Sequence, residues 1–402
     1  MHHPSRLSSD STRCSAWASN YLSRRQSVRR LRHCCLMAGT TAALLSLVSI
    51  TPISGVQAQE IYPMIDPSEE PEPFLPSGTP ALVAQEIVDP VEIEAIASVG
   101  MTVSDMDRAI AFYEQVLDFT KISDVEVHGR NYELMQGVFG IRMRVVQLQL
   151  GDEIIELTDY LTVGGRPIPI DSRSTDQWFQ HIAIVVSDMD AAYQRLRTFN
   201  VQHVSTGPQR LPETIPAAAG IEAFYFQDPD GHNLELIYFP PDKGDPRWQE
   251  PTDELFLGID HTAIGIADTE TSRQFYEDLL GLEIVGNSMN AGTEQEHLNN
   301  VFGARLNITG LRANEGIGLE FLDYLSPATG RPYPADSQAH DLWHWETTVV
   351  VANADAAAAR LQDAGVPFVS SGTVEFPGRS LGFAKGFLVR DPDGHVIRII
   401  ER

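Results

Sequence analysis

The chain has little cysteine, little positive charge and no long apolar run. Its 402 residues include three cysteines, Cys14, Cys34 and Cys35, and none after residue 35. Most of the chain therefore needs no disulfide bond to fold. Only 29 Lys and Arg oppose 55 Asp and Glu, which gives a formal net charge of −26. This balance argues against nucleic acid or an anionic membrane as a partner.

The most apolar stretch, residues 34–50, is too short for a typical membrane span. It follows a basic stretch, Arg24–Arg32, and small residues up to Ala58 follow it. This order predicts that residues 1–58 are an export signal that is cleaved after Ala58. The remaining protein would then be periplasmic or secreted, with no membrane anchor. The alternative is an irregular tail that contains a chance apolar patch.

Internal repeats organise the rest of the chain. Residues 59–94 are rich in Pro, Glu and Ser, a composition that cannot bury a core, and we interpret them as a linker. After this linker, residues 95–240 and 255–402 match each other, and residues 241–254 join them. Each half contains two βαβββ-like units, so the chain is a tandem duplication with four modules.

Two short motifs define these modules. The first and third modules run from a strand through an Asp into a helix that carries Phe-Tyr-Glu, at Phe112–Glu114 and Phe275–Glu277. The second and fourth modules contain the turn Asp-Pro-Asp-Gly-His, at Asp228–His232 and Asp391–His395, before a last strand. Apolar residues at helical spacing predict a helix after each first strand.

A His and a Glu occupy one face of two strands in the second module. Side chains alternate between faces along a strand, so His181 shares a face with Ala183 while Ile182 points the other way. Glu235 is likewise opposite to the flanking leucines of its strand. A polar pair beside a small residue is typical of the floor of a cup.

The four modules resemble the vicinal oxygen chelate superfamily, which includes glyoxalase I, extradiol dioxygenases, fosfomycin-resistance enzymes and bleomycin-binding proteins. The resemblance covers about residues 95–402 and implies an α+β fold in which two tandem domains form cup-shaped mixed sheets. In that family, two modules close a cup around a divalent metal, and each offers one residue from its first strand and one from its last. Substrates bind the metal through two adjacent oxygen atoms.

The resemblance assigns two metal positions to each module. In module order they are Ser98 and Glu156, His181 and Glu235, His261 and Glu320, and Glu346 and Arg398. Arginine stays protonated and cannot ligate a metal. We therefore expect a salt bridge between Arg398 and Glu346 where a metal would otherwise lie.

The modules can pair in two ways. Pairing within each half gives two incomplete sites, the second of which could use His344 as a substitute ligand. Pairing across the halves joins modules two and three into a complete set of two His and two Glu, and leaves a relic site in modules one and four. We favour this crosswise pairing because all four of the best ligands lie in the two central modules.

The expected cofactor is one divalent metal: Zn, Ni, Fe or Mn. The favoured function is a glyoxalase-like isomerase or lyase that acts on a small α-hydroxy or α-keto substrate, with Glu235 or Glu320 as both ligand and general base. The alternatives are an extradiol-type Fe(II) dioxygenase and a non-enzymatic cup that sequesters a small molecule.

Two further candidates lie in the loop before the strand of His181. Arg166 and Asp171 belong to a Gly-Arg-Pro-x-Pro-x-Asp-Ser sequence that recurs in the second half. Arginine is suited to an anionic group on a substrate, so we interpret these two residues as weaker candidates for substrate binding. With the halves paired, the chain would be an internal pseudo-dimer and could be monomeric in solution.

Overall fold

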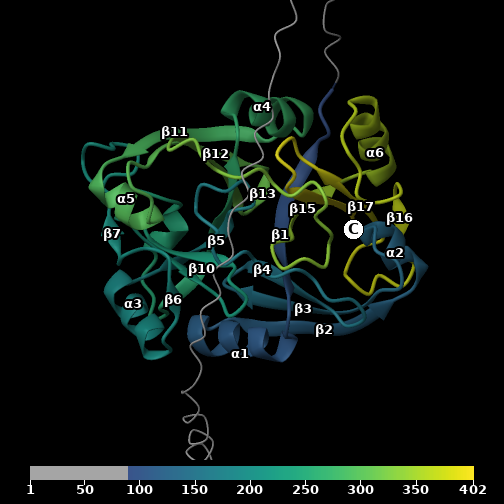
Figure 1. Ribbon diagram of the computed structural model, residues 1–402, viewed down its shortest axis with the longest axis horizontal. Helices are drawn as coiled ribbons and strands as arrows, with labels where there is room; N and C mark the ends of the chain where they lie inside the picture. Colours follow the sequence, from purple (N-terminus) through teal and green to yellow (C-terminus); the bar gives the residue numbers. More distant parts are fainter. Residues whose placement is uncertain (1–88) are drawn as a thin grey trace, which may run out of the picture. The chain divides into compact units, whose positions relative to one another are not determined.

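A computed structural model describes residues 89–402. The predicted export segment and most of the first linker lie outside the described residues. The described part of the chain contains no helix with the length and apolar character that a membrane crossing requires. It consists of four modules of strands and helices (Figure 1).

The first module consists of β1 (Ile93–Val103), α1 (Met106–Leu117), β2 (Thr120–His128), α2 (Arg130–Gln136), β3 (Arg142–Leu150) and β4 (Glu153–Tyr160). The second consists of β5 (Gln180–Val186), α3 (Met189–Thr198), β6 (Gln202–His203), β7 (Gln209–Arg210), β8 (Glu222–Gln227) and β9 (Asn233–Tyr238). A short helix, η1 (Pro246–Gln249), lies between the halves.

The third module consists of β10 (Phe256–Ile266), α4 (Thr269–Arg273) with its continuation η2 (Gln274–Leu279), β11 (Glu283–Ala291), α5 (Thr293–Asn299), β12 (Arg305–Arg312), β13 (Glu315–Gly316) and β14 (Gly318–Ser326). The fourth consists of β15 (Trp345–Val351), α6 (Ala354–Asp363), β16 (Val374–Glu375), β17 (Lys385–Arg390) and β18 (Val396–Glu401).

Each module begins with a strand that leads into a capped helix. The side chains of Asp105, Asp188, Asp268 and Asn353 accept a hydrogen bond from the backbone N–H three residues later. Such a cap satisfies a donor that the first turn of a helix leaves unpaired. The predicted helix after each first strand is confirmed, and the recurring Asp or Asn is the residue that starts it.

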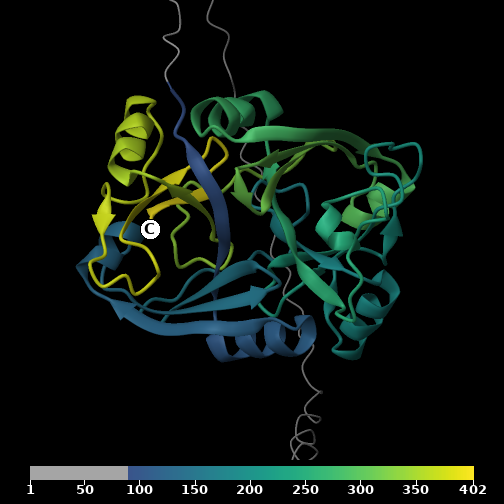
Figure 2. The same cartoon turned by 180° about the vertical axis from the view of Figure 1, so that it is seen from behind.

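The described strands form two nine-stranded sheets. The first has the order β16-β17-β18-β15-β1-β4-β3-β2, with β13 added beside β1; the second has the order β11-β12-β14-β10-β5-β9-β8-β6, with β7 added beside β8. The first sheet thus joins modules one and four through antiparallel β1 and β15, and the second joins modules two and three through β5 and β10. In Figures 1 and 2, blue and yellow strands accordingly lie together, as do teal and green strands. The crosswise pairing is confirmed.

The central strands have one face in the core and one face in the cup. Ile182 and Ile184 of β5 are fully buried in a hydrophobic core that includes residues of both sheets and of the helices. His181 and Ala183 alternate with them and therefore point to the opposite face. The predicted α+β fold with two tandem domains and cup-like sheets is confirmed.

The two repeated motifs contact each other. Tyr113, from Phe-Tyr-Glu of α1, donates a hydrogen bond to Asp228 Oδ2 at 3.3 Å. The same carboxylate oxygen lies 2.8 Å from Nδ1 of His232, whose Nε2 lies 2.7 Å from the carbonyl oxygen of Leu342. The second half repeats the contacts of the aspartate with the tyrosine and with Nδ1 of the histidine, through Tyr276, Asp391 and His395. Each tyrosine thus ties the first module of a half to the last turn of that half.

Candidate metal centre

The four predicted ligands of the central modules lie together on the cup face of the second sheet. In the strand register, Ala183 lies opposite both His261 and Glu235, and Ala263 lies opposite both His181 and Glu320. Because residues opposite each other on neighbouring strands share a face, two His and two Glu surround two small side chains. Alanine at these two positions leaves room between the ligands.

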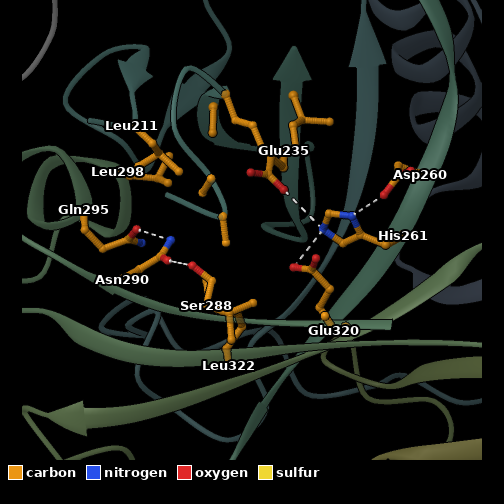
Figure 3. A pocket seen from close by; sticks show the side chains of 18 of the residues that line it. Leu211, Glu235, Asp260, His261, Ser288, Asn290, Gln295, Leu298, Glu320 and Leu322 are labelled. Carbon is orange, nitrogen blue, oxygen red and sulfur yellow. Dashed lines mark hydrogen bonds and ion pairs between the residues drawn. The ribbon is translucent and has the colours of Figure 1, made fainter. Parts of the chain in front are cut away.

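The polar atoms of this group converge. Oε2 of Glu235 lies 3.1 Å from Nε2 of His181 and 3.6 Å from Nε2 of His261. Nε2 of His261 also lies 3.4 Å from Oε2 of Glu320. His181, Glu235 and His261 can each offer one ligand atom such that these atoms all lie within 4.8 Å of one another. The dashed lines in Figure 3 show the contacts of His261 with both glutamates.

The chemistry of these donors fits a divalent metal. Both ring nitrogens of His181 are buried and have no hydrogen-bond partner among the described residues, although Nε2 is close to Glu235. Buried polar atoms in native proteins nearly always have a partner. Imidazole nitrogens together with a carboxylate are ligands for Zn, Ni, Fe and Mn. A cation between these side chains would supply the partner that His181 lacks.

Asp260 orients His261 and was not predicted from the sequence. Its Oδ2 lies 2.9 Å from His261 Nδ1, and its Oδ1 accepts hydrogen bonds from Trp248 and Arg312 at 3.1 and 3.0 Å. Neighbours along a strand normally point to opposite faces, but the register of β10 shifts after Ile259. A carboxylate on Nδ1 fixes the ring and leaves Nε2 directed at the other ligands.

Negative charge dominates the centre. Burial by itself lowers the pKa of His261, but the neighbouring carboxylates, chiefly Glu320 and Asp260, raise it to about 9. Burial also raises the pKa of Glu320 from its usual range, although the charge of His261 opposes this. In the absence of another cation, the imidazole of His261 therefore holds a proton at neutral pH. The same electrostatic field favours a divalent metal.

The centre opens into a cavity of about 250 Å³. The Glu320 side chain is 31% exposed to it, whereas the Glu235 side chain is 6% exposed. Tyr225 also lines the cavity, and its ring lies 4.9 Å from the ring of His181. Nothing in the sequence pattern indicated Tyr225, because it lies on β8 in the middle of an aromatic run.

The relic positions of modules one and four form an ion cluster in the first sheet. Nη1 of Arg398 contacts the carboxylates of Glu156 and Glu346, the latter at 3.2 Å, and all three side chains are buried. Nε2 of His344 lies 3.1 Å from Glu346, so this His contacts the cluster and not a second centre; Ser98 lies on the neighbouring strand β1. The expected salt bridge between Arg398 and Glu346 is confirmed. The guanidinium of Arg398 thus occupies the position that a metal ion would take.

Arg166 and Asp171 lie in a reciprocal contact between the two halves. Arg166 binds Asp341 at 2.7 Å and stacks over Trp343, and Asp171 accepts from Arg331 at 3.1 Å. Neither Arg166 nor Asp171 lines the cavity above the centre. The structure thus assigns both residues to the joining of the halves, and a substrate role for them stays a prediction.

The fold and the site define a protein with two tandem cup-forming domains and one centre whose residues fit a divalent metal. Residues 95–236 and 258–399 each match the Glyoxalase/Bleomycin resistance protein/Dioxygenase superfamily. The chain therefore belongs to this superfamily, which confirms the resemblance inferred from the four modules.

Named relatives within the superfamily have different activities. The chain is 32% identical over 152 residues to 2-epi-5-epi-valiolone epimerase from an Actinomyces species, a match that covers 36% of this chain and 80% of that protein. It is 28% identical over 152 residues to metallothiol transferase FosB from Shouchella clausii, with the same coverage of each chain. The fold is similar to that of a glyoxalase I variant from Zea mays, with a TM-score of 0.51, 16% identity, and coverage of 77% of this chain and 92% of that chain.

Proposed function

We propose that the protein is a metal-dependent enzyme that isomerises a small molecule carrying two adjacent oxygen functions. The observation that carries this proposal is the convergence of His181, Glu235 and His261 within 4.8 Å, at the floor of a cavity. These three residues would hold the metal, with Glu320 beside them. A bound divalent metal would act as a Lewis acid that stabilises negative charge developing on the substrate oxygens.

Glu320 is the residue best placed to move a proton. Its carboxylate is more exposed to the cavity than that of Glu235, and its pKa is raised by burial. A carboxylate with a raised pKa is a more effective general base near neutral pH. We therefore assign Glu320 to remove a proton from the carbon next to a carbonyl group and to return it. The epimerase named among the relatives is consistent with such a reaction.

Metal content tests the site. We expect the full-length protein to bind about one divalent metal per chain, and both His181→Ala and His261→Ala to lose it, because three-ligand sites tolerate the loss of one imidazole poorly. Elemental analysis after loading and dialysis measures this. His344→Ala is the matched control, because His344 is a buried histidine that directly precedes β15 of the other sheet. Full metal retention in both single variants would contradict the proposal.

One observation favours a second function, that of an Fe(II) dioxygenase. The tightest group has two His and one carboxylate, which is the ligand set of many non-heme iron oxygenases. Turnover that consumes oxygen and requires Fe(II) would assign this function. Turnover without oxygen, accompanied by exchange of a carbon-bound proton, would assign the isomerase. If a small molecule binds but is not converted with any of the four metals, the cup is a sequestering protein.

A further inference from the structure

The side chains that line the cavity above the centre include more acids than cations. Of the described residues that line it, none is Lys or Arg, whereas Glu235, Asp260 and Glu320 are acidic. Arg312 contacts Asp260 at 3.0 Å but is not among the lining residues. An anionic ligand would therefore meet three carboxylates that outnumber the one imidazole, His261, and juxtaposed like charges are costly.

One wall of the cavity is polar and uncharged. It is formed by β11 and α5, where Ser288 donates a hydrogen bond to Asn290, and Asn290 donates to Gln295 at 2.9 Å. Gln295 in turn donates to Asn299. Each residue in this series donates to the next one, and none donates to Ser288. The hydroxyl oxygen of Ser288 therefore keeps its capacity to accept a hydrogen bond. Figure 3 shows Ser288, Asn290 and Gln295 side by side on one side of the cavity.

Asn287 does not add to this wall. It lies opposite Thr309, to which its amide donates a hydrogen bond at 3.0 Å, and Thr309 lies opposite Phe321 of the core. The Asn287 side chain is therefore on the other face of β11. The polar wall presents the hydroxyl oxygen of Ser288 as an acceptor, and a ligand that satisfies it must carry an O–H or N–H donor.

Much of the remaining lining is apolar. It includes Leu211, Ile221 and Phe239 of the second module and Ile308 and Leu322 of the third. A ligand that fits this lining has an apolar face and a hydroxylated face. This pattern suits a compact hydroxylated carbon skeleton, because its C–H surface can pack on the apolar side chains while its hydroxyl groups donate to the polar ones.

The closed cup of the first sheet provides an internal comparison. In the repeat, the places of Ser288, Asn290 and Gln295 are taken by Val125, Val127 and Tyr132. Val127 is buried in an apolar cluster, against which Val125 and Tyr132 pack. Polar residues therefore line the cup that is open and apolar residues fill the cup that is closed, so the polar wall is not a requirement of the fold.

A second difference between the cups lies beside the glutamates. Gly310 lies opposite Glu320, whereas Gln147 takes the equivalent place opposite Glu156. Gln147 donates to Glu156 at 3.1 Å, and the Glu156 side chain is only 3% exposed. The absence of a side chain at residue 310 leaves Glu320 open to the cavity.

We propose that the substrate is an uncharged, hydroxylated α-hydroxy or α-keto compound with one apolar face, and not an anion such as a carboxylate or a phosphate ester. This inference rests on the proposed function, because the two adjacent oxygens would lie at the metal. The charge preference, however, comes from the walls and from the acids of the centre. It therefore holds for binding to the protein without metal as well.

Two ring compounds of similar size test the charge preference. The neutral probe is 2-hydroxycyclohexanone, and the anionic probe is cis-2-hydroxycyclohexanecarboxylate. Binding of each to the full-length protein is measured by isothermal titration calorimetry, both in metal-free and in metal-loaded protein. We expect the neutral probe to bind at least about tenfold more tightly in metal-free protein. Tighter or equal binding of the anion there would overturn the proposal.

A charge introduced at the polar wall tests where the preference arises. Ser288→Arg places a cation on the cavity face of β11, and we expect it to raise the affinity for the anionic probe while weakening that for the neutral probe. Met289→Arg is the matched control: it adds the same charge at the next residue, which is exposed on the other face of the strand and does not line the cavity. A similar response of both variants would assign the effect to net charge and overturn the assignment to this wall.

The outcomes separate this inference from the proposed function. A preference for the neutral probe that Ser288→Arg reverses supports the inference, whatever the metal content. Failure of the protein to bind any metal overturns the proposed function alone. No measurable binding of the neutral probe in either form of the protein overturns the inference alone. Thermal melts of both arginine variants establish that they are folded.

Discussion

Glu235 and Glu320 have equivalent places on the last strands of modules two and three, but their surroundings differ. Glu235 lies between two imidazoles, at 3.1 Å and 3.6 Å, and is almost fully buried. Glu320 contacts one imidazole and faces the cavity, because Gly310 lies opposite it. Burial and contact with two nitrogens suit a ligand, whereas access to the cavity suits a base.

We expect Glu320→Gln to slow proton exchange at carbon by about 10² or more, because the amide cannot accept a proton. Exchange of the α-proton of 2-hydroxycyclohexanone in D2O, followed by NMR with metal-loaded protein, measures this. Metal content should stay close to that of the unchanged protein, since three ligands remain. Glu315→Gln, at an exposed position of β13, is the control. An unchanged exchange rate would reassign the base to another residue.

Arg398 supplies the positive charge that a metal would supply in an equivalent centre, because its guanidinium stays protonated. It is buried with Glu156 and Glu346 and forms an ion pair with each. We expect Arg398→Met to lower the free energy of unfolding by about 3–5 kcal/mol, because two buried carboxylates lose their partner. Urea denaturation measures the change.

The control for this variant removes the carboxylate charges as well. Glu156→Gln combined with Arg398→Met and Glu346→Gln leaves no unpaired charge, and most of the lost stability should return. Metal content should not change in either variant, because these residues lie in the other sheet. If the single variant lost no more stability than the triple variant, the ion pairs of this cluster would not stabilise the fold.

At the scale of elements, the Asp-Pro-Asp-Gly-His turn is a packing device as well as a reversal of the chain. Asp228 accepts hydrogen bonds from the backbone N–H groups of Asp230 and His232, both at 2.9 Å, and from Tyr113 of α1. The two nitrogens of His232 contact a carboxylate and a carbonyl oxygen, so a doubly protonated ring satisfies both. The turn, the helix and the loop before β15 are thereby held together.

This contact predicts a pH dependence of stability. Burial by itself lowers the pKa of His232, but the charge of Asp228 has the larger effect and raises this pKa above the ordinary 6.5. Burial by itself raises the pKa of Asp228, but the charge of His232 and its hydrogen bonds lower this pKa below the ordinary 3.8. The contribution of His232 is therefore fully present below pH 6.5 and is lost as the pH rises through its raised pKa, while that of Asp228 is lost below pH 3.8.

We expect the stability difference between the protein and its His232→Gln variant to be about 2 kcal/mol between pH 4 and pH 6.5, and to shrink at higher pH. Chemical denaturation from pH 4 to pH 10 measures it. His128→Gln, which changes an exposed histidine, should show no such trend. A difference that grew with rising pH would mean that His232 is neutral in the folded protein.

At the scale of the whole molecule, the two halves exchange modules. Each sheet takes one module from each half, so the centre combines His181 and Glu235 of one half with His261 and Glu320 of the other. The reciprocal contacts of Arg166 with Asp341 and of Arg331 with its partners join the halves at the adjoining loops. Neither half contains a complete centre.

Separate expression of the halves tests this arrangement. We expect residues 59–242 alone and residues 243–402 alone to bind no metal tightly, because each supplies only one imidazole of the centre. When co-expressed, they should form a one-to-one complex that binds one metal. Analytical ultracentrifugation and elemental analysis measure both properties. Tight binding of one metal by the isolated first half would contradict the crosswise centre.

The sequence by itself determined the architecture and indicated four candidate ligands. The duplication, the helix after each capped strand and the cup face of β5 follow from local chemistry and from the two-residue period of a strand. The sequence favoured the crosswise pairing, since Arg398 cannot ligate a metal and the four candidate ligands lie in the central modules, and the strand order confirmed it. The predicted export segment lies outside the described residues and stays a prediction.

Only the tertiary structure decided which cup is open and what supports its centre. Gly310 and Gln147 hold equivalent positions in the two sheets, and only Gln147 has a side chain. Whether the glutamate is covered depends on which of the two lies opposite it in the neighbouring strand. Asp260 reaches His261 because of an irregularity in the register of β10. Arg166 binds the carboxylate of Asp341, which lies 175 residues later in the chain and in the other half. Such contacts depend on register and on the volumes of distant side chains, which periodicity within one segment does not encode.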